Sequence, residues 1–403
     1  MTLTPEGQQA PFSAWHGLLV VGVFCLTPLA AWLGTRAFAP MLALGGLLAL
    51  PGIQPTRPGR SVLLILGVLL AWADISAIWS PFSPRSLAVS TPVKLALEAV
   101  SYWSFVCAAT TARADVRRLA GRILAFGAAA LGALMVFEAM TGGGLYIGLR
   151  TLVHEPMRPD LAVRNVARAI YPLVLLTPAA ALAALRERHG LRLILPMLLG
   201  VAAASIVFDY DAPLLALGAG GAAGLSVYRF PRSGPTILAA IGVLFLIGAP
   251  AVVWGTRTLG WYDPLQHLAP LSWAQRMGYW RAASDLIGAL PLRGWGLDAS
   301  RMFDPRIKLH PHDSALQIWL ELGAIGAALV AALWVTVLLR LRRDTSDPAA
   351  ALAAATAVIY LTLGAVSFGV WQEWWLALAA LASAACLIVR DPNPDPVQRP
   401  SSS

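Results

Sequence analysis

Residues 309–326 read LHPHDSALQIWLELGAIG and open a hydrophobic segment that runs on to Leu339. His310 and His312 stand two residues apart at its start, and Asp313 follows directly. The longest polar stretch of the chain comes immediately before them. A polar loop that runs into a long apolar helix predicts a functional junction at one surface of a membrane-embedded scaffold.

The composition of the whole chain supports a membrane location. Of its 403 residues, 58% are hydrophobic and only 13% are charged, whereas a soluble domain carries about 25% charged residues. The net charge of +9 comes almost entirely from arginine. Such a balance fits orientation by positive loops or recognition of phosphates, and no basic face of a soluble domain exists to bind nucleic acid.

The fold class predicted from hydropathy is all-α, a polytopic membrane helix bundle with about 12 transmembrane helices. A spanning helix needs about 20 mostly apolar residues. Segments that approach this length lie near 16–34, 37–53, 61–79, 92–112, 118–140, 165–185, 191–208, 211–228, 235–255, 313–340, 348–369 and 371–389.

These segments divide the chain into four parts. Residues 1–255 would hold transmembrane helices 1–9, and 256–312 would form one large periplasmic loop bearing an amphipathic helix. Residues 313–390 would supply helices 10–12, and 391–403 a disordered cytoplasmic tail rich in proline and serine.

The positions of the cations predict the orientation. With a cytoplasmic N-terminus, most arginines fall in the inner connections, and the short outer ones hold only Arg36, Arg85 and Lys94. This arrangement obeys the positive-inside rule. We therefore expect a multi-pass protein of the bacterial inner membrane with cytoplasmic termini and a site that faces the periplasm.

Two longer outer regions, near 141–168 and 256–311, carry cations that work against this orientation. Arg164 and Arg168 belong to the first, and Arg276 and Arg281 belong to the second. Either an anionic ligand requires them, or they serve ordinary loop solvation and contact lipid headgroups.

Acidic residues also gather in the outer half of the expected helices, namely Asp74, Glu98, Glu138, Glu321 and Glu373. Intramembrane acids are costly and usually face a cavity or a partner. Together they indicate a polar cavity open to the outer leaflet, although for each one alone a local pair with an arginine is the better interpretation.

The large outer loop contains an expected amphipathic helix. Apolar residues recur at steps of three and four from Trp273 to Leu290, which is the helical period. Arg276 stands at the margin of this stripe, where a guanidinium can bind a phosphate through two hydrogen bonds. A snorkelling arginine at the membrane interface is the alternative.

At the end of that loop, a neutral imidazole of His312 or His310 could take a proton from a hydroxyl. Asp313 could orient the ring or share its charge. The alternative is that both are surface histidines of a loop with no catalytic role. The chain has no P-loop, no dinucleotide-binding glycine motif and no Cys/His metal spacing, so we expect no cofactor, no metal and no nucleotide-sugar donor bound in a soluble fold.

At these residues the sequence resembles the O-antigen ligase and O-antigen polymerase superfamily. The family motif places a histidine before an amide or hydroxyl residue, then nine residues, a glycine, two residues and a small residue. Here it is matched by His312, Gly323 and Gly326, with Asp313 as a departure. A second match is the loop pattern of Arg276 and Trp280, followed by Gly294 and Gly296. Weaker echoes lie at residues 70–81 and 164–168, and Asp209–Asp211 stand where many members have an arginine.

The resemblance implies a glycosyltransferase that moves a glycan from an undecaprenyl-diphosphate donor to lipid A–core at the periplasmic face. His312 would be the base and Arg276 would stabilise the leaving diphosphate, without a metal ion. The expected substrate-binding residues are Arg281, Arg164, Arg168, His310, Asp313 and Trp280.

Two alternatives stay open. A polymerase of the same superfamily would use a growing polysaccharide as the acceptor and share the scaffold and the chemistry. A twelve-helix transporter or flippase is disfavoured, because transporters tend to place charges near the midplane between related halves. Here the charges gather at the outer surface.

Overall fold

The computed structural model describes residues 12–53, 57–86, 90–187 and 190–390, and within these ranges all regular structure is helical. The expected tail from 391 to 403 lies outside the described residues. The α-helices are α1 Ser13–Leu33, α2 Phe38–Ala49, α3 Arg57–Ser76, α4 Thr91–Thr111, α5 Ala114–Thr141, α6 Gly144–Leu152, α7 Pro159–Ala167, α8 Ile170–Leu185, α9 Gly190–Val207, α10 Asp211–Arg229, α11 Gly234–Thr258, α12 Tyr262–Leu268, α13 Leu271–Ala289, α14 Ser314–Leu339, α15 Pro348–Val366 and α16 Glu373–Ile388. Short 3₁₀ turns occupy Thr35–Ala37, Ala77–Trp79 and Ala299–Met302.

The all-helical, multi-pass class is confirmed. Each of the twelve segments expected to span is helical in the structure, and eight stretches in the described ranges are long and apolar enough to cross a membrane. The remaining four segments correspond to α2, α4, α10 and α16. These helices pack among the others, α10 on α15 and α16 on α4. The count of twelve crossings stays a prediction.

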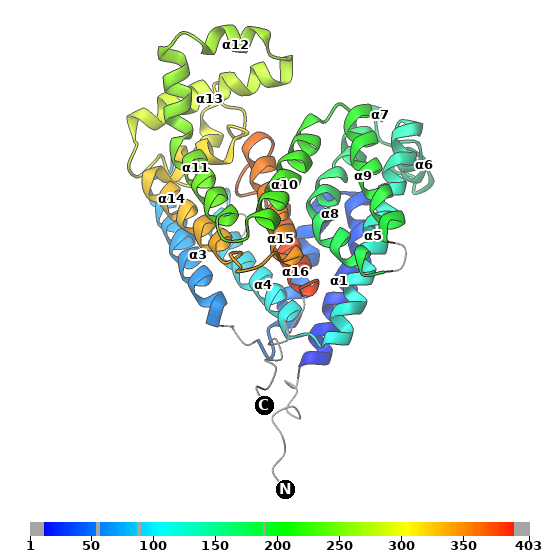
Figure 1. Cartoon of the computed structure of the whole chain (residues 1–403). Coiled ribbons are helices and arrows are strands. Elements are labelled where there is room, and N and C mark those ends of the chain that lie inside the picture. The colour runs from blue at the N-terminus through cyan, green and yellow to red at the C-terminus, as the bar shows by residue number, and fades with distance from the viewer. Residues whose placement is uncertain (1–11, 54–56, 87–89, 188–189, 391–403) are drawn as a thin grey trace, which may run out of the picture.

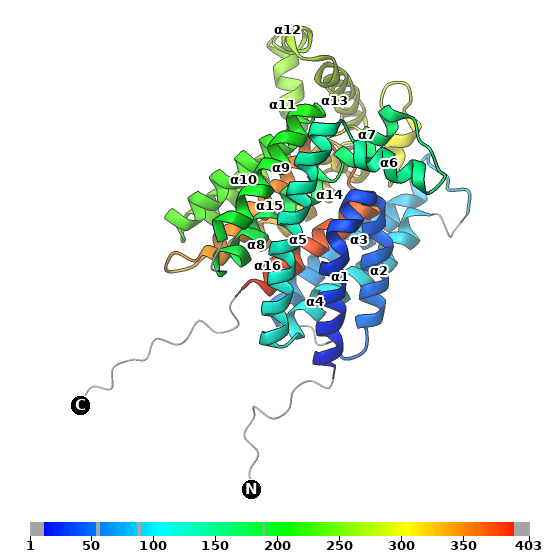
Figure 2. The same cartoon turned by 90° about the vertical axis from the view of Figure 1, so that its right-hand side faces the viewer.

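Both regions expected to be outer loops lie at the same end of the molecule. α12 and α13 project beyond the ends of the long helices, and α6 and α7 lie at that end as well (Figures 1 and 2). The helix predicted from the apolar residues between Trp273 and Leu290 is present as α13. Its apolar side packs against α14 and α11, so α13 is anchored on the protein core and does not depend on lipid contact alone.

Two large apolar cores hold the helices together. One is formed mainly by α1, α2, α4, α5, α8, α9 and α16, and the other by α3, α11, α13 and α14. The connection between α15 and α16 joins them, because Phe368 belongs to the first core and Trp371 to the second. This connection lies directly against the start of α14, where Gln317 accepts a hydrogen bond from the Val370 amide at 3.0 Å.

A break in α14 at Gly323 fixes the polar loop to the bundle. Gly323 has φ +65° and ψ −164°, a conformation that is essentially restricted to glycine. The interrupted helix exchanges backbone hydrogen bonds with the loop: Gly296 N donates to Glu321 O and Ala324 N to Pro291 O, each at 2.8 Å. The backbone groups freed by the break therefore keep partners, as a membrane environment requires.

The glycines of the two sequence motifs meet at this break. A Cβ on Gly294 would lie 2.5 Å from the Glu321 carbonyl, and a Cβ on Gly323 would lie 2.2 Å from Leu292 O. Gly296 has φ +98° and lies against the backbone of α3, 2.5 Å from Ser76 O by the same measure. The spacing of these glycines thus reflects the close approach of two backbones.

The acidic residues of the outer half have local structural partners. Glu321 is fully buried and accepts hydrogen bonds from Ser300 Oγ at 2.6 Å and Trp371 Nε1 at 2.5 Å. Glu138 accepts from Trp32 Nε1 at 2.6 Å and from the first backbone amides of α6. Glu373 pairs with Lys94 at 2.6 Å. A shared polar cavity is therefore not needed to account for these three acids.

We predict that Gly323→Ala destabilises the protein by at least about 2 kcal/mol, because the added Cβ meets Leu292 O and the required φ is strained for alanine. The unfolding midpoint in detergent measures this change. Gly248→Ala in α11 is the matched control, since nothing lies within 4 Å of its Cβ; it should change stability by no more than about 1 kcal/mol. Equal midpoints for the two variants would contradict the strained break.

Candidate active site

His312 stands at the mouth of α14 with its ring held by the neighbouring connection. Its Nδ1 lies 3.0 Å from the Ser367 carbonyl oxygen. A carbonyl can only accept, so this contact places the proton on Nδ1 and leaves a lone pair on Nε2. Ser367 caps the end of α15. His312, two residues before α14, is thus oriented by the end of α15.

Burial and neighbouring charge keep the His312 ring neutral. Burial lowers the pKa of His312 below its ordinary value of 6.5, the Ser367 hydrogen bond raises it, and the positive charge of Arg276 lowers it. The titratable groups that face the ring are His310, with ring centroids 4.1 Å apart, Tyr279, stacked at 6.0 Å, and Arg276. A neutral imidazole with a free Nε2 can serve as a general base.

His310 supports His312 and is itself buried. Its Nδ1 accepts a hydrogen bond from the His312 backbone amide at 3.2 Å, and its Nε2 lies 3.3 Å from the side-chain amide nitrogen of Gln372. Burial, with His312 and Arg301 nearby, lowers the pKa of His310 to about 3. Both ring nitrogens therefore have protein neighbours, which favours His312 as the base.

Asp313 is the N-cap of α14 and contacts the helix backbone. Its Oδ1 accepts a hydrogen bond from Leu316 N at 2.9 Å, and burial raises the pKa of its carboxyl to about 7. The ring of His312 is oriented by Ser367 and not by Asp313. The departure from the family pattern is consistent with capping, because Asp, Asn and Ser are all good N-cap residues.

Arg276 approaches the histidine from α13. Tyr279 lies one turn further along the same helix, and its ring stacks on His312. The Arg276 guanidinium lies 5.1 Å from the ring centroid of Trp273, and burial lowers its pKa while Tyr171 and Asp211 act to raise it. Its charge also acts on His312. Arg276 is therefore close enough for its charge to act on the His312 ring, which Tyr279 of the same helix contacts.

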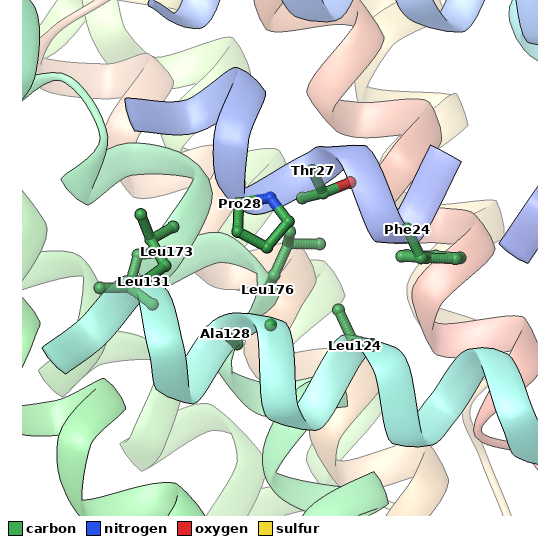
Figure 3. Close-up of a pocket in the computed structure, with 9 residues that line it drawn as sticks. Phe24, Thr27, Pro28, Leu124, Ala128, Leu131, Leu173 and Leu176 are labelled. Carbon is green, nitrogen blue, oxygen red and sulfur yellow. The ribbon is translucent and has the colours of Figure 1, made fainter. Parts of the chain in front are cut away.

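Trp280 and Asp313 line a cavity of about 160 Å³ between α11, α13 and α14. Its other walls are apolar and include Phe245 and Leu316. A second pocket lies between α1, α5 and α8 (Figure 3). Its lining is apolar apart from Thr27, whose hydroxyl donates a hydrogen bond to Val23 O within α1.

The remaining predicted arginines differ in their surroundings. Arg281 pairs with Asp263 and stacks over Tyr262 at 5.1 Å, so it joins α13 to α12. Arg164 is exposed and Arg168 is half-buried, and neither has an ion-pair partner among the residues that the structure describes. Arg168 and Arg276 both lie within electrostatic range of the Tyr171 hydroxyl. Of the three, Arg168 is the one that the structure relates to Arg276.

Several groups around His312 carry no signal in the sequence. Ser367 acts through its backbone carbonyl, which every residue possesses. Tyr279 and Tyr171 lie on α13 and α8, and only the fold brings them to the site. Asp211, at the start of α10, acts on Arg276 where many family members have an arginine.

The fold and the site define a class of protein: a membrane helix bundle with a buried histidine at the start of one helix and an arginine whose charge acts on it. Residues 210–331 match the family model of O-antigen ligases. This segment runs from α10 to α14 and contains Arg276, His312 and Gly323. The resemblance indicated by the motifs is confirmed over this segment.

Curated relatives agree with the family match. A Rickettsia bellii protein named "Putative polysaccharide ligase" is 33% identical over 118 residues, 26% of this chain and 29% of its own length. Proteins with that description from Rickettsia conorii and Rickettsia felis are 30% and 28% identical over the same shares. The alignments thus span under a third of the relatives.

We predict that the two histidines titrate differently. His312 should protonate only below pH 6.5, because its pKa is lowered, and His310 should stay neutral down to about pH 4, because its pKa is about 3. Ring ¹⁵N shifts of histidine-labelled protein, assigned with His310→Gln and His312→Gln variants, measure both. Protonation of His310 near pH 6.5 would mean that its ring is hydrated and would contradict the burial described above.

Proposed function

We propose that the chain is an O-antigen-ligase-type glycosyltransferase that uses an undecaprenyl-diphosphate-linked glycan as donor and lipid A–core as acceptor. The observation that carries the proposal is the His312 ring: its Nδ1 contacts Ser367 O, its Nε2 has no hydrogen-bond partner among the described residues, and the charge of Arg276 acts on it. The match to O-antigen ligases over 210–331 supports the substrate class.

In this mechanism, His312 Nε2 takes the proton of an acceptor sugar hydroxyl. The hydroxyl oxygen attacks the anomeric carbon of the donor, and the bond between that carbon and the diphosphate oxygen breaks. Undecaprenyl diphosphate leaves with the bonding electron pair. Arg276 stabilises the negative charge as it develops, and the proton on His312 is then released to water or to the diphosphate.

The surroundings of Arg276 suit a diphosphate on a lipid. Arg164 in the last turn of α7 and Arg168 at its C-cap add positive charge, and a guanidinium can bind two phosphate oxygens through parallel hydrogen bonds. The apolar cavity lined by Trp280 and Phe245 opens next to Asp313 and could hold the first isoprene units. Arg281 has a smaller part in this scheme, because Asp263 already binds it. His310 and Asp313 would act through His312 and the start of α14.

The proposal includes the orientation expected from the cations. The end that carries α6, α7, α12 and α13 would face the periplasm of a bacterial inner membrane, and the termini would be cytoplasmic. All twelve helical segments would cross the membrane, with the loop from 256 to 312 on the periplasmic side. Membrane lipids are then the surrounding partners, and nucleic acid is not among them.

A polymerase of the same superfamily is the second candidate, because the same base and arginine would serve a growing polysaccharide acceptor. The transporter or flippase alternative is less consistent with a histidine whose tautomer is fixed by a carbonyl at one end of the bundle. In reconstituted vesicles the three differ by product: glycan on lipid A–core, a lengthened lipid-linked chain, or donor moved without a new bond.

We predict that His312→Ala lowers glycan transfer by at least about 100-fold, because the general base is lost. Arg276→Ala should lower it by about 100- to 1,000-fold, because the leaving charge is no longer stabilised. The measurement is transfer from undecaprenyl-diphosphate glycan to lipid A–core by purified protein in proteoliposomes. Arg306→Ala is the matched control, since Arg306 is an exposed cation of the same loop, and it should retain wild-type transfer.

Transfer by His312→Ala at a near wild-type rate would overturn the base assignment. The guanidinium of Arg276 is expected to supply the positive charge that a divalent ion supplies in many other glycosyltransferases. Transfer should therefore persist in EDTA, and restoration of a lost activity by a divalent ion would contradict this part of the proposal.

A further inference from the structure

Three side chains follow one another along the first turns of α14. Asp313, Gln317 and Glu321 are four residues apart, so they lie on one side of the helix. Asp313 caps the helix, and the other two are buried, with Gln317 4% and Glu321 0% exposed. Buried polar side chains need partners, and Gln317 and Glu321 each have one in the connection between α15 and α16.

Gln317 joins this connection to Glu321. Its Oε1 accepts from Val370 N at 3.0 Å, and its Nε2 donates to Glu321 Oε1 at 3.1 Å. Trp371 Nε1 donates to the second carboxylate oxygen of Glu321 at 2.5 Å. Two successive residues of the connection are therefore bonded to two successive turns of α14.

The same connection supplies the carbonyl that orients His312. Ser367 lies three residues before Val370, and its oxygen is 3.0 Å from His312 Nδ1. Gly369 between them leaves little room, because a Cβ there would lie 3.0 Å from His310 Cδ2 and 3.3 Å from Gln317 Oε1. Phe368 is packed on Tyr171 at 4.5 Å. A shift of Val370 would therefore be transmitted to Ser367.

We infer that Gln317 and Glu321 are positioning residues, which hold the connection from Ser367 to Gln372 so that the Ser367 carbonyl fixes the tautomer of His312. The inference rests on the proposed function for its kinetic consequence but not for its structural one. Neither side chain need touch a substrate. Their effect passes through Val370 and Trp371 to Ser367, and from Ser367 to the proton on Nδ1.

Ser300 provides a matched control within the same network. Its Oγ donates to Glu321 Oε1 at 2.6 Å, the atom that Gln317 also contacts. Ser300→Ala removes one donor from Glu321 on the side of the polar loop and leaves the bonds of Gln317 and Trp371 in place. Gln317→Met removes one donor from the same oxygen and also the bond to Val370 N. The two variants thus separate loss of a Glu321 contact from loss of the connection's anchor.

We predict that Gln317→Met gives a mixture of His312 tautomers, whereas wild type and Ser300→Ala keep Nδ1 protonated. Ring ¹⁵N shifts distinguish a protonated from an unprotonated nitrogen and need no activity. In the transfer assay Gln317→Met should lower kcat by about tenfold, less than loss of the base itself, with KM unchanged. Because the Ser367 bond raises the pKa of His312, its loss should move the acid limb of kcat to lower pH.

A single Nδ1-protonated tautomer in Gln317→Met, with an unchanged pH profile, would overturn the inference, as would equal tautomer mixing in Ser300→Ala. Where Gln317→Met yields no folded protein, Trp371→Phe takes its place, because it removes the direct bond between the connection and Glu321 and keeps an aromatic ring; the same direction of change is expected. If tautomers respond as predicted but no protein transfers glycan, the proposed function fails and the positioning role stands.

Discussion

The break in α14 at Gly323 is the constraint on which the rest of the structure depends. A continuous helix would keep its backbone hydrogen bonds to itself, whereas the broken one shares them with residues 291–296 of the polar loop. The loop is thereby fixed to the bundle, and Glu321, two residues before the break, accepts hydrogen bonds from Ser300, Gln317 and Trp371. One irregular residue thus joins the polar loop, α14 and the α15–α16 connection.

The geometry of the candidate site follows from that junction. His312 precedes α14, Arg276 reaches it from α13, and Ser367 reaches it from the end of α15. Burial lowers the pKa of both histidines, and the positive charge of Arg276 lowers that of His312 further, so the His312 ring is neutral. A neutral base next to a cation suits a reaction in which a proton leaves a hydroxyl while negative charge develops on a departing group.

Hydropathy predicted the helical class and nearly every helix, because lipid requires long apolar segments whatever their packing. The spacing of the motifs singled out Gly323 and Gly294, and the structure gives the reason: the two backbones approach so closely there that a side chain would not fit. Glu321 and Glu138 were harder to interpret, because an acid in an apolar segment does not reveal whether it faces a cavity or a set of local donors. Ser367 could not be predicted, as its contribution is a carbonyl and its position depends on the turn after α15. Arg281 pairs with Asp263, eighteen residues earlier, and its role in substrate binding stays a prediction.

The central claim is that Arg276 and His312 share one diphosphate-linked substrate. A cryo-electron microscopy structure of the protein in nanodiscs with undecaprenyl diphosphate tests it most directly. The account predicts the diphosphate within about 3 Å of the Arg276 guanidinium, on the side from which His312 Nε2 is reached. A diphosphate bound away from α13, with Arg276 and His312 both free of it, would contradict the account.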